Sequence, residues 1–440
     1  MKVVVTVYEE TYQSAVRAIR AIENPHDMVE VRAERFSSID LGAIRAATAR
    51  PIILTYRTGG VMAPVDAGER GPLTWPGGPD VRDAALRAGI DFVDVEWHEG
   101  VSVELPDRTV ISHHDYEGVR DVEEIMARMA ALDCAYTKLA ATPRTFSDNE
   151  RLLQLLQTAN GKLPAVIGMG ERGLYSRILA PFRGSALTFV AAGNVAAPGQ
   201  LTLARALEIY GTHPRQAERV FAVAGNPAGH SQSPAIHNRL FREKGVPAAY
   251  TIASVEHFRE LEEAFLRGEP CGLSVTAPFK DDAFAFAAPF HVAENARRAR
   301  AVNTLVNVNG RILADNTDVD GFAGLLPAAS RAAILGAGAT SRAALVALED
   351  AGIPAVVYNR TASKGDASLE ELRHFDGDLI INTLPAGVEV AIPRCRTYIE
   401  ASYAGAPRAV QADLRIGGLE LLHAQAVRQH QLFMKVFDGV

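Results

Sequence analysis

The sequence has few of the features that indicate metal, disulfide, membrane or nucleic-acid chemistry. Its three cysteines, Cys134, Cys271 and Cys395, are far apart and show no CxxC or CxxH spacing, which argues against a metal site or a disulfide framework. Such cysteine usage is typical of a reducing compartment. The apolar start, residues 1–10, is too short for a signal peptide or a membrane span. With a net charge of −7 and no basic cluster, we expect a cytoplasmic enzyme that binds no metal, membrane or nucleic acid.

The residues that are present describe an ordinary globular chain with a repeated pattern in its first half. A length of 440 residues, with 48% apolar and 22% charged residues, allows two or three domains with buried cores. Short apolar runs alternate there with stretches of helical spacing, such as 13–22 and 122–132. The expected strands are 3–8, 28–34, 51–57, 92–97, 109–115, 134–140, 164–170 and 186–192. Eight strand–helix units favour a closed (β/α)8 barrel over an open sheet.

Two candidate catalytic residues lie in these apolar runs. Lys138 stands near the far end of the run 134–140, and His114 near the end of the run 109–115. A desolvated amine loses its proton more readily than an exposed one and becomes a nucleophile towards carbonyl groups. A histidine transfers protons near neutral pH. We expect both side chains to lie at strand ends and to point into one pocket.

Further polar residues follow the same pattern, since each lies near the expected carboxyl end of a strand or just beyond it. They are Glu30, Arg32, Arg57, Asp94, Glu96 and Arg177. Arginine binds carboxylates through a two-pronged fork, so the three arginines predict an anionic substrate. The glycines of the segment 169–177 suit a loop close to a ligand, and the turn 196–200 ends in an amide, Gln200. Ion pairs that seal the top of a barrel are the alternative interpretation.

These segments resemble type I 3-dehydroquinate dehydratase over about residues 1–210. The resemblance rests on ExR at 30–32, TYR at 55–57, DVE at 94–96, SHHD at 112–115, Lys138, MGxxGxxSR and PGQ. It implies that Lys138 forms an imine with the substrate ketone, that His114 moves the proton, and that Asp94 or Glu96 orients the histidine. It assigns substrate binding to Glu30, Arg32, Arg57, Arg177 and Gln200. The chain departs from the family at Ala196, where a serine is usual.

A second pattern begins after the linker 211–219, which contains glycine, proline and charged residues. A strand there leads into a Gly- and Ser-rich loop before a helix, and Ser231 and Ser233 stand at alternate positions. Both hydroxyls could reach one carboxylate, whereas a helix N-cap is the alternative role for Ser233. Lys280 ends another expected strand, 272–280, Asn303 lies in a third apolar run, and Asp318 lies in a turn before a helix. A lysine and an aspartate around one cleft polarise a carbonyl and transfer a proton.

The segment 331–352 reads as a strand, a GxG turn and a helix, the order that a phosphate-binding turn requires. Gly336 and Gly338 form the turn, and the next expected strand, 356–360, ends in Asn359 and Arg360. An acidic residue at that place binds the ribose of NAD, whereas an arginine accommodates the 2′-phosphate of NADP. We therefore expect NADP(H). An ordinary surface arginine is the alternative interpretation.

This half resembles shikimate dehydrogenase over about residues 219–440. The matches are HSQSP at 230–234, SVTxPxK at 274–280, AVNT at 301–304, NTD at 316–318, GAG at 336–338 and NRT at 359–361. They imply that Lys280 and Asp318 are catalytic. Ser231, Ser233, Thr276, Asn303 and Gln425 would bind the substrate, and Gly336, Gly338, Ala339, Asn359, Arg360 and Thr361 the cofactor. Leu384 and the short segment 403–418 depart from the family, and the nearest match to its D-x-x-Y element ends in Tyr403.

Together the two resemblances predict an α/β chain with two activities. An N-terminal (β/α)8 barrel (1–212) would dehydrate 3-dehydroquinate to 3-dehydroshikimate. A two-lobed shikimate-dehydrogenase-like domain would reduce that product with NADPH, using a substrate lobe (219–322 and 419–440) and a Rossmann-like NADP lobe (323–418). Two alternatives stay open: a dehydrogenase of quinate or another hydroxy acid, or a half retained only for binding or scaffolding. The first family also makes a homodimer possible.

Overall fold

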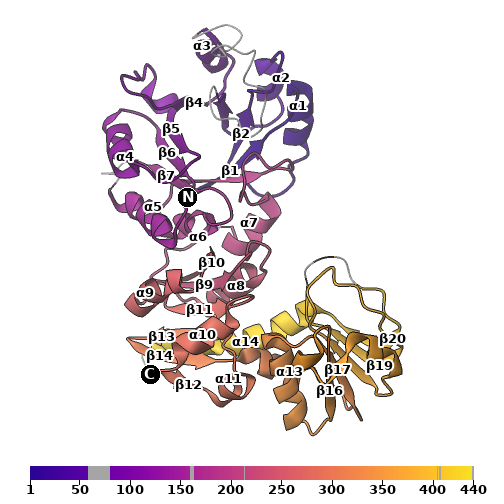
Figure 1. The fold of residues 1–440 in the computed structure, drawn as a ribbon. Helices are drawn as coiled ribbons and strands as arrows, with labels where there is room; N and C mark the ends of the chain where they lie inside the picture. The colour runs from indigo at the N-terminus through magenta and orange to yellow at the C-terminus, as the bar shows by residue number, and fades with distance from the viewer. Residues whose placement is uncertain (58–79, 159–162, 213, 404, 406–407, 439–440) are drawn as a thin grey trace. The chain divides into compact units, whose positions relative to one another are not determined.

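The computed structural model describes residues 1–57, 80–158, 163–212, 214–403, 405 and 408–438 (Figure 1). Its chain separates into two compact units. One consists of residues 1–218 and 241–254, and the other of residues 219–240 and 255–440. The finer boundaries that we expect for the barrel and the two lobes stay predictions.

A ring of eight parallel strands forms the centre of the first unit (Figure 1). The strands are β1 (Lys2–Val7), β2 (Met28–Arg32), β3 (Ile52–Thr55), β4 (Phe92–Glu96), β5 (Thr109–Asp115), β6 (Tyr136–Ala141), β7 (Pro164–Gly168) and β8 (Leu187–Ala191). Their order is β7-β6-β5-β4-β3-β2-β1-β8, so the last strand pairs with the first. Ala186 N donates to the Pro164 carbonyl at 2.7 Å and links the starts of β7 and β8. The expected (β/α)8 barrel is confirmed.

Helices connect these strands and cover the outside of the barrel. They are α1 (Tyr12–Arg20), α2 (Leu41–Arg45), α3 (Asp80–Arg87), α4 (Val122–Ala131), α5 (Phe146–Thr158), α6 (Leu174–Leu179) and α7 (Leu203–Tyr210), with 3-10 turns at Pro106–Arg108 and Ala180–Arg183. Local sequence explains several helix starts: Thr11 and Ser14 form a capping box on α1, and Thr202 caps α7. Apolar residues of the helices, such as Ile19, pack against outward strand residues such as Leu54.

Side chains alternate along each strand, and the inward positions change character from one end of the barrel to the other. The apolar layer inside the barrel includes Val4, Met28, Ile53, Val110, Tyr136, Ala165 and Leu187. Two residues further along their strands stand Thr6, Glu30, Thr55, Ser112 and Lys138, all buried. Because the period of a strand is two, both sets face the interior. Parallel strands end on the same side, so the polar layer lies where barrels of this type carry their sites.

Beyond Glu218 the chain forms two six-stranded sheets. The first is mixed, in the order β10-β9-β11-β13-β14-β12. Its strands are β9 (Arg219–Gly225), β10 (Ala248–Ser254), β11 (Gly272–Val275), β12 (His291–Val292), β13 (Thr304–Val308) and β14 (Arg311–Asp315). The helices of this region are α8 (Ser233–Lys244), α9 (Arg259–Arg267), α10 (Lys280–Ala287), α11 (Glu294–Ala299) and α12 (Thr317–Ala323), and the final helix is α14 (Gly418–Asp438).

The second of these sheets is parallel throughout, in the order β17-β16-β15-β18-β19-β20. Its strands are β15 (Ala332–Leu335), β16 (Ala355–Asn359), β17 (Ala367–Ser368), β18 (Leu379–Asn382), β19 (Cys395–Glu400) and β20 (Ala412–Ile416). Helix α13 (Ala339–Asp350) follows β15, and 3-10 turns occupy Ala362–Lys364 and Leu369–His374. The order reverses between β15 and β18, and ligands of such sheets bind at this switch point. The expected Rossmann-like sheet is confirmed.

Several predicted positions were wrong. Lys138 is the third residue of β6 rather than its end, because the strand continues to Ala141. Lys280 opens α10 instead of ending a strand: β11 stops at Val275, and Pro278, which lacks the N–H that a strand ladder needs, follows three residues later. Asn303 lies just before β13, and Asp318 belongs to the first turn of α12.

None of the described helices combines the length and the apolar character that a membrane span requires.

Candidate active sites

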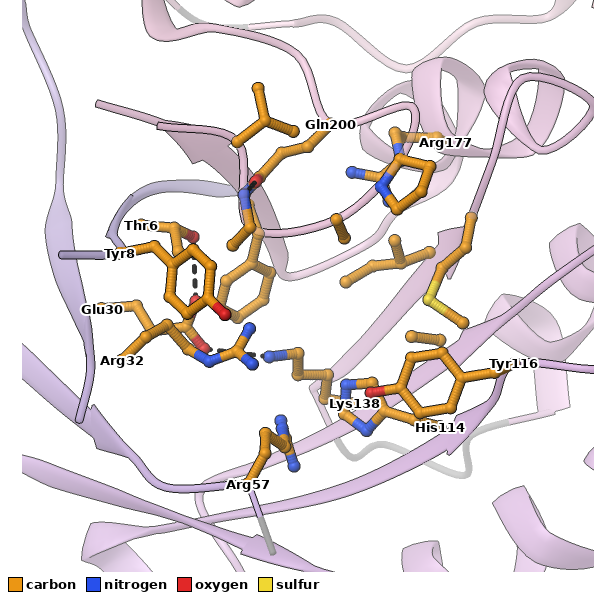
Figure 2. Close-up of a pocket in the computed structure, with 18 residues that line it drawn as sticks. Thr6, Tyr8, Glu30, Arg32, Arg57, His114, Tyr116, Lys138, Arg177 and Gln200 are labelled. Carbon is orange, nitrogen blue, oxygen red and sulfur yellow. Dashed lines mark hydrogen bonds and ion pairs between the residues drawn. The ribbon is translucent and has the colours of Figure 1, made fainter. Parts of the chain in front are cut away.

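The polar end of the barrel encloses a cavity of about 350 Å³ (Figure 2). Seven predicted site residues line it: Glu30, Arg32, Arg57, His114, Lys138, Arg177 and Gln200. The two remaining ones, Asp94 and Glu96, lie behind this wall and bind Arg57. The barrel therefore brings together residues that are up to 170 positions apart, from Glu30 to Gln200.

Lys138 is buried among carboxylates and one aromatic ring. Its Nζ lies 3.1 Å from Glu30 Oε1, 3.4 Å from Asp94 Oδ2 and 3.9 Å from the centre of the Phe189 ring. Burial alone would raise the pKa of Glu30, but Lys138, Arg32 and Arg57 outweigh it and lower that pKa to about 2. Glu30 is therefore ionised at neutral pH and holds the amine in the centre of the barrel.

His114 is oriented by Glu96. Its Nδ1 lies 3.1 and 3.2 Å from the two Glu96 oxygens, and its backbone N donates to Glu96 Oε1 at 3.0 Å. A carboxylate beside Nδ1 favours the tautomer that carries its proton there, which leaves Nε2 free to accept one. Burial, together with the charges of Arg57 and Lys138, lowers the pKa of His114 well below its usual value. The imidazole is therefore neutral at pH 7 and suited to act as a base.

Arg57 links the carboxylates of the site. Its guanidinium donates to Asp94 Oδ2 at 2.8 Å, to Ser112 Oγ at 2.8 Å and to Glu96 Oε2. Both predicted supporting carboxylates contact Arg57, but only Glu96 contacts His114 and Asp94 contacts Lys138. A substrate contact for Arg57 stays a prediction.

Arg177 differs from the other arginines because it pairs with no carboxylate of the described residues. It lies on α6 rather than at a strand end, is 6% exposed, and its Nε donates to the Gly168 carbonyl at 2.8 Å. Burial lowers its pKa to about 10. A buried cation beside a cavity needs an anion, and a substrate carboxylate is suited to that role.

Two loops complete the wall beside Arg177. Gly199 has φ +72°, and a Cβ there would lie 2.4 Å from the Gly170 carbonyl oxygen, so only glycine permits their close packing. Gly170 N donates to the Pro198 carbonyl at 3.0 Å. Gln200 Oε1 accepts from Ala196 N at 2.9 Å, which leaves its amide nitrogen for other contacts.

A second cavity of about 140 Å³ lies in the other unit. Every catalytic and substrate-binding residue that we predict for this half lines it: Ser231, Ser233, Thr276, Lys280, Asn303, Asp318 and Gln425. Lys280 Nζ lies 2.6 Å from Asp318 Oδ2, and Asn303 Nδ2 donates to Asp318 Oδ1 at 2.9 Å. Ser231 Oγ accepts from Ser233 N at 3.3 Å at the start of α8. The lysine and the aspartate are thus already in contact.

Sequence reasoning missed two residues of this site. Gln429 binds the Ser274 hydroxyl at 2.5 Å, the Thr304 hydroxyl at 2.8 Å and the Asn303 carbonyl at 3.2 Å. Its position one helical turn after Gln425 was a usable signal. Thr340 accepts a hydrogen bond from Lys280 Nζ at 3.1 Å. That contact joins α10 to α13 and has no local sequence signal.

The residues around the GxG turn fit a dinucleotide. Gly336 has φ +102°, and a Cβ there would lie 2.8 Å from Thr383 Oγ1. Gly338 precedes α13 and has open space where a Cβ would stand, so a phosphate has room beside the amino end of the helix. Arg360 is exposed just after β16 and forms no ion pair with any described residue. Asn359 Nδ2 donates to the Thr361 carbonyl at 3.0 Å and shapes that turn.

Comparisons with known proteins find matches in both halves of the chain. Residues 3–216 match the family model of type I 3-dehydroquinase, and residues 223–305 match that of the shikimate dehydrogenase substrate binding domain. The pentafunctional AROM polypeptide of Zygosaccharomyces rouxii is 31% identical over 380 residues, which are 80% of this chain and 23% of that polypeptide. The chain thus spans under a quarter of that relative.

A shorter relative matches across both halves. The chloroplastic bifunctional 3-dehydroquinate dehydratase/shikimate dehydrogenase of Arabidopsis thaliana is 27% identical over 429 residues, which are 85% of this chain and 69% of that protein. Among solved structures, the dehydroquinate dehydratase and shikimate dehydrogenase from S. pombe AroM is 21% identical, covers 99% of this chain and 98% of that chain, and has a TM-score of 0.38.

Proposed function

We propose two consecutive activities for this chain, because its residues 3–216 match the family model of type I 3-dehydroquinase and its residues 223–305 match that of the shikimate dehydrogenase substrate binding domain. The barrel dehydrates 3-dehydroquinate to 3-dehydroshikimate. The second unit reduces the ketone of 3-dehydroshikimate to the alcohol of shikimate. The Arabidopsis relative carries both names in one chain, which supports the pairing.

The buried amine of Lys138 supplies the nucleophile of the first reaction. In its neutral form, Nζ adds to the substrate ketone, and loss of one water gives an iminium ion. This cation takes the place of the lysine charge between Glu30 and Asp94, whose oxygens lie 3.1 and 3.4 Å from Nζ. The two carboxylates therefore stabilise it electrostatically. Arg177 binds the substrate carboxylate and fixes the ring.

His114 then completes the elimination. Its Nε2 removes a proton from the carbon next to the iminium carbon, and the electron pair forms an enamine. The enamine expels the hydroxyl group from the following carbon, and His114 returns its proton to that hydroxyl, which leaves as water. Glu96 stabilises the imidazolium between these steps through Nδ1. Hydrolysis of the iminium consumes one water and frees Lys138, so the net change is the loss of one water.

The second reaction adds a hydride to the carbonyl carbon of the ketone and a proton to its oxygen. NADPH, when bound, supplies the hydride. Lys280 donates a proton to the carbonyl oxygen as it becomes an alcohol, and Asp318, 2.6 Å from Lys280 Nζ, stabilises the charge of the lysine. Asn303 holds Asp318 in place. Ser231, Ser233, Thr276 and Gln425 surround the substrate, and Gly336, Gly338, Ala339, Asn359 and Thr361 the cofactor.

NADP is the form of the cofactor that we propose. No carboxylate ends β16, where Asn359 and Arg360 stand, so the ribose hydroxyl of NAD lacks its usual partner. The exposed guanidinium of Arg360 is suited to bind a 2′-phosphate. Replacement of Arg360 by glutamine should raise the KM for NADPH and leave that for NADH unchanged.

The contact of Lys138 with Glu30 and Asp94, beside a histidine held by Glu96, is the observation that carries the proposal. The test is a coupled assay with 3-dehydroquinate and NADPH, followed by the loss of NADPH absorbance. Borohydride treatment with 3-dehydroquinate should add the mass of a reduced adduct at Lys138. Oxidation of NADPH only with 3-dehydroshikimate would refute the barrel activity, and none with either substrate would refute the reductase.

A further inference from the structure

Two tyrosines line the barrel cavity and have no part in the chemistry proposed above. Tyr8 follows β1 and Tyr116 follows β5. In the ring of strands these two are four positions apart, so they lie on opposite sides of the barrel. Figure 2 shows both phenol oxygens directed from opposite sides towards the space around Lys138. Neither oxygen has a hydrogen-bond partner among the described residues, although both rings are only partly exposed.

Both rings are held in place by their neighbours. The Arg32 guanidinium lies 5.4 Å from the centre of the Tyr8 ring, and that of Arg35 lies 4.9 Å from it. The Tyr116 ring stacks on the His114 ring, with centres 6.0 Å apart and planes inclined by 22°. The hydroxyl groups are therefore fixed in position before a ligand arrives, which reduces the entropy lost on binding.

Arg177 binds the substrate carboxylate in the proposed reaction, and several other polar groups of the cavity already have protein partners. Glu30 is occupied by Lys138 and by the Thr6 and Thr55 hydroxyls at 2.8 and 2.9 Å. Arg57 is occupied by carboxylates, and Ala196 lines the cavity with only a methyl group. A tyrosine hydroxyl both donates and accepts, so it can pair with a substrate hydroxyl in either direction.

We propose that Tyr8 and Tyr116 are specificity-determining residues, which bind hydroxyl groups on opposite sides of the substrate ring while Lys138 holds its ketone between them. This inference rests on the proposed dehydration and names how its polyhydroxylated substrate is recognised. Tyr116 also stacks on one face of the His114 ring. A substrate hydroxyl bound to Tyr116 therefore lies near the base that transfers the proton.

The test compares Tyr8→Phe and Tyr116→Phe with the unsubstituted full chain, because phenylalanine removes only the hydroxyl. Each variant should raise the KM for 3-dehydroquinate about three- to tenfold, the value of one hydrogen bond to a neutral partner. Tyr12→Phe, on α1 and outside the cavity, is the matched control and should leave KM unchanged. Product formation is followed through the ultraviolet absorbance of the conjugated ketone.

Substrate analogues distinguish direct contact from a packing effect. Two analogues, each lacking one of the ring hydroxyls that the product retains, are assayed with every variant. For the analogue that lacks the partner hydroxyl, the Phe variant should show no further rise in KM. The inference would be overturned if the Phe substitution raised KM by the same factor for both analogues as for 3-dehydroquinate. It would also be overturned if the KM of the Phe variants for 3-dehydroquinate stayed within twofold of that of the unsubstituted chain. An unsubstituted chain that neither dehydrates 3-dehydroquinate nor gives an adduct with borohydride would instead overturn the proposed function, and this inference with it.

Discussion

Replacement of Arg177 by methionine should make the first unit more stable and, at the same time, impair its binding of substrate. Arg177 is 6% exposed and pairs with no described carboxylate, and burial lowers its pKa from 12.5 to about 10. A depressed pKa in a base means that folding disfavours the charged form. The cost is therefore complete at pH 7 and is relieved only as the pH rises through 10 towards 12.5.

The pKa shift gives the magnitude. A decrease of about 2.5 pKa units corresponds to about 3 kcal/mol at 1.36 kcal/mol per unit. The substitution also removes the hydrogen bond to the Gly168 carbonyl, which costs about 1 kcal/mol. Methionine has a similar length and fills the space with an apolar chain. The expected net result is an unfolding free energy about 2 kcal/mol higher than that of the unsubstituted chain.

Tryptophan fluorescence isolates this unit during denaturant unfolding, since both tryptophans, Trp75 and Trp97, precede Glu218. Arg128→Met, at an exposed helical ion pair, is the control and should change stability by less than about 0.5 kcal/mol. Addition of 3-dehydroquinate at 100 times its Kd should stabilise the unsubstituted chain by about 2.7 kcal/mol and Arg177→Met much less. A variant that is destabilised by about 1 kcal/mol or more would refute the reasoning that the Arg177 charge is uncompensated.

Four further predictions concern single residues. Lys138→Met should abolish dehydration and the borohydride adduct but leave reduction of 3-dehydroshikimate unchanged, which the two halves of the coupled assay measure separately. The acid limb of the dehydration pH profile should lie well below pH 6.5, because burial and nearby cations lower the pKa of His114; an acid limb at or above pH 6.5 would contradict this assignment. Asp115→Asn should destabilise the first unit by about 1–2 kcal/mol at pH 7, because Arg120 and backbone N–H groups lower the pKa of Asp115 to about 2 against the effect of burial; this difference should be complete above pH 4 and disappear as the pH falls through 2. Thr340→Val should remove the hydroxyl that Lys280 contacts and lower kcat for the reductase about two- to tenfold, whereas Thr340→Ser should restore it.

The sequence was sufficient for the architecture because the hydrophobic pattern repeats. Eight apolar runs separated by helical spacing predict the barrel, and the strand–GxG–helix order predicts the parallel sheet. The end positions of strands were less predictable, since the apolar run begins at Cys134 whereas β6 begins at Tyr136 and continues to Ala141. Lys138 consequently lies inside the barrel and not at its rim. There its amine contacts Glu30 and Asp94, which no spacing in the sequence marks as its neighbours.

The residues that contact the predicted site residues were harder to predict than the site residues themselves. Gln429 and Thr340 bind residues of the proposed reductase site from helices that come close to it only when the chain folds. No local pattern sets the distance between α10 and α13, so no spacing in the sequence indicates that Lys280 meets Thr340. The same holds for Tyr8 and Tyr116, whose hydroxyls have no partner among the described residues, because only the closure of the ring places β1 opposite β5.

The different contacts of Asp94 and Glu96 show most clearly how strand register determines the role of a residue. The two residues stand two apart on β4, so both side chains point into the barrel, about 7 Å apart along the strand. Glu96 pairs in register with Ser112, two residues before His114, and its longer side chain reaches the Nδ1 of that histidine. Asp94 stands nearer the start of β4 and has a shorter side chain, so it meets Lys138 instead, while both carboxylates contact Arg57. An exchange of the two residues, Asp94→Glu with Glu96→Asp, should therefore break both contacts although charge and composition are unchanged, and loss of dehydration with normal reduction would show that position along the strand decides their roles.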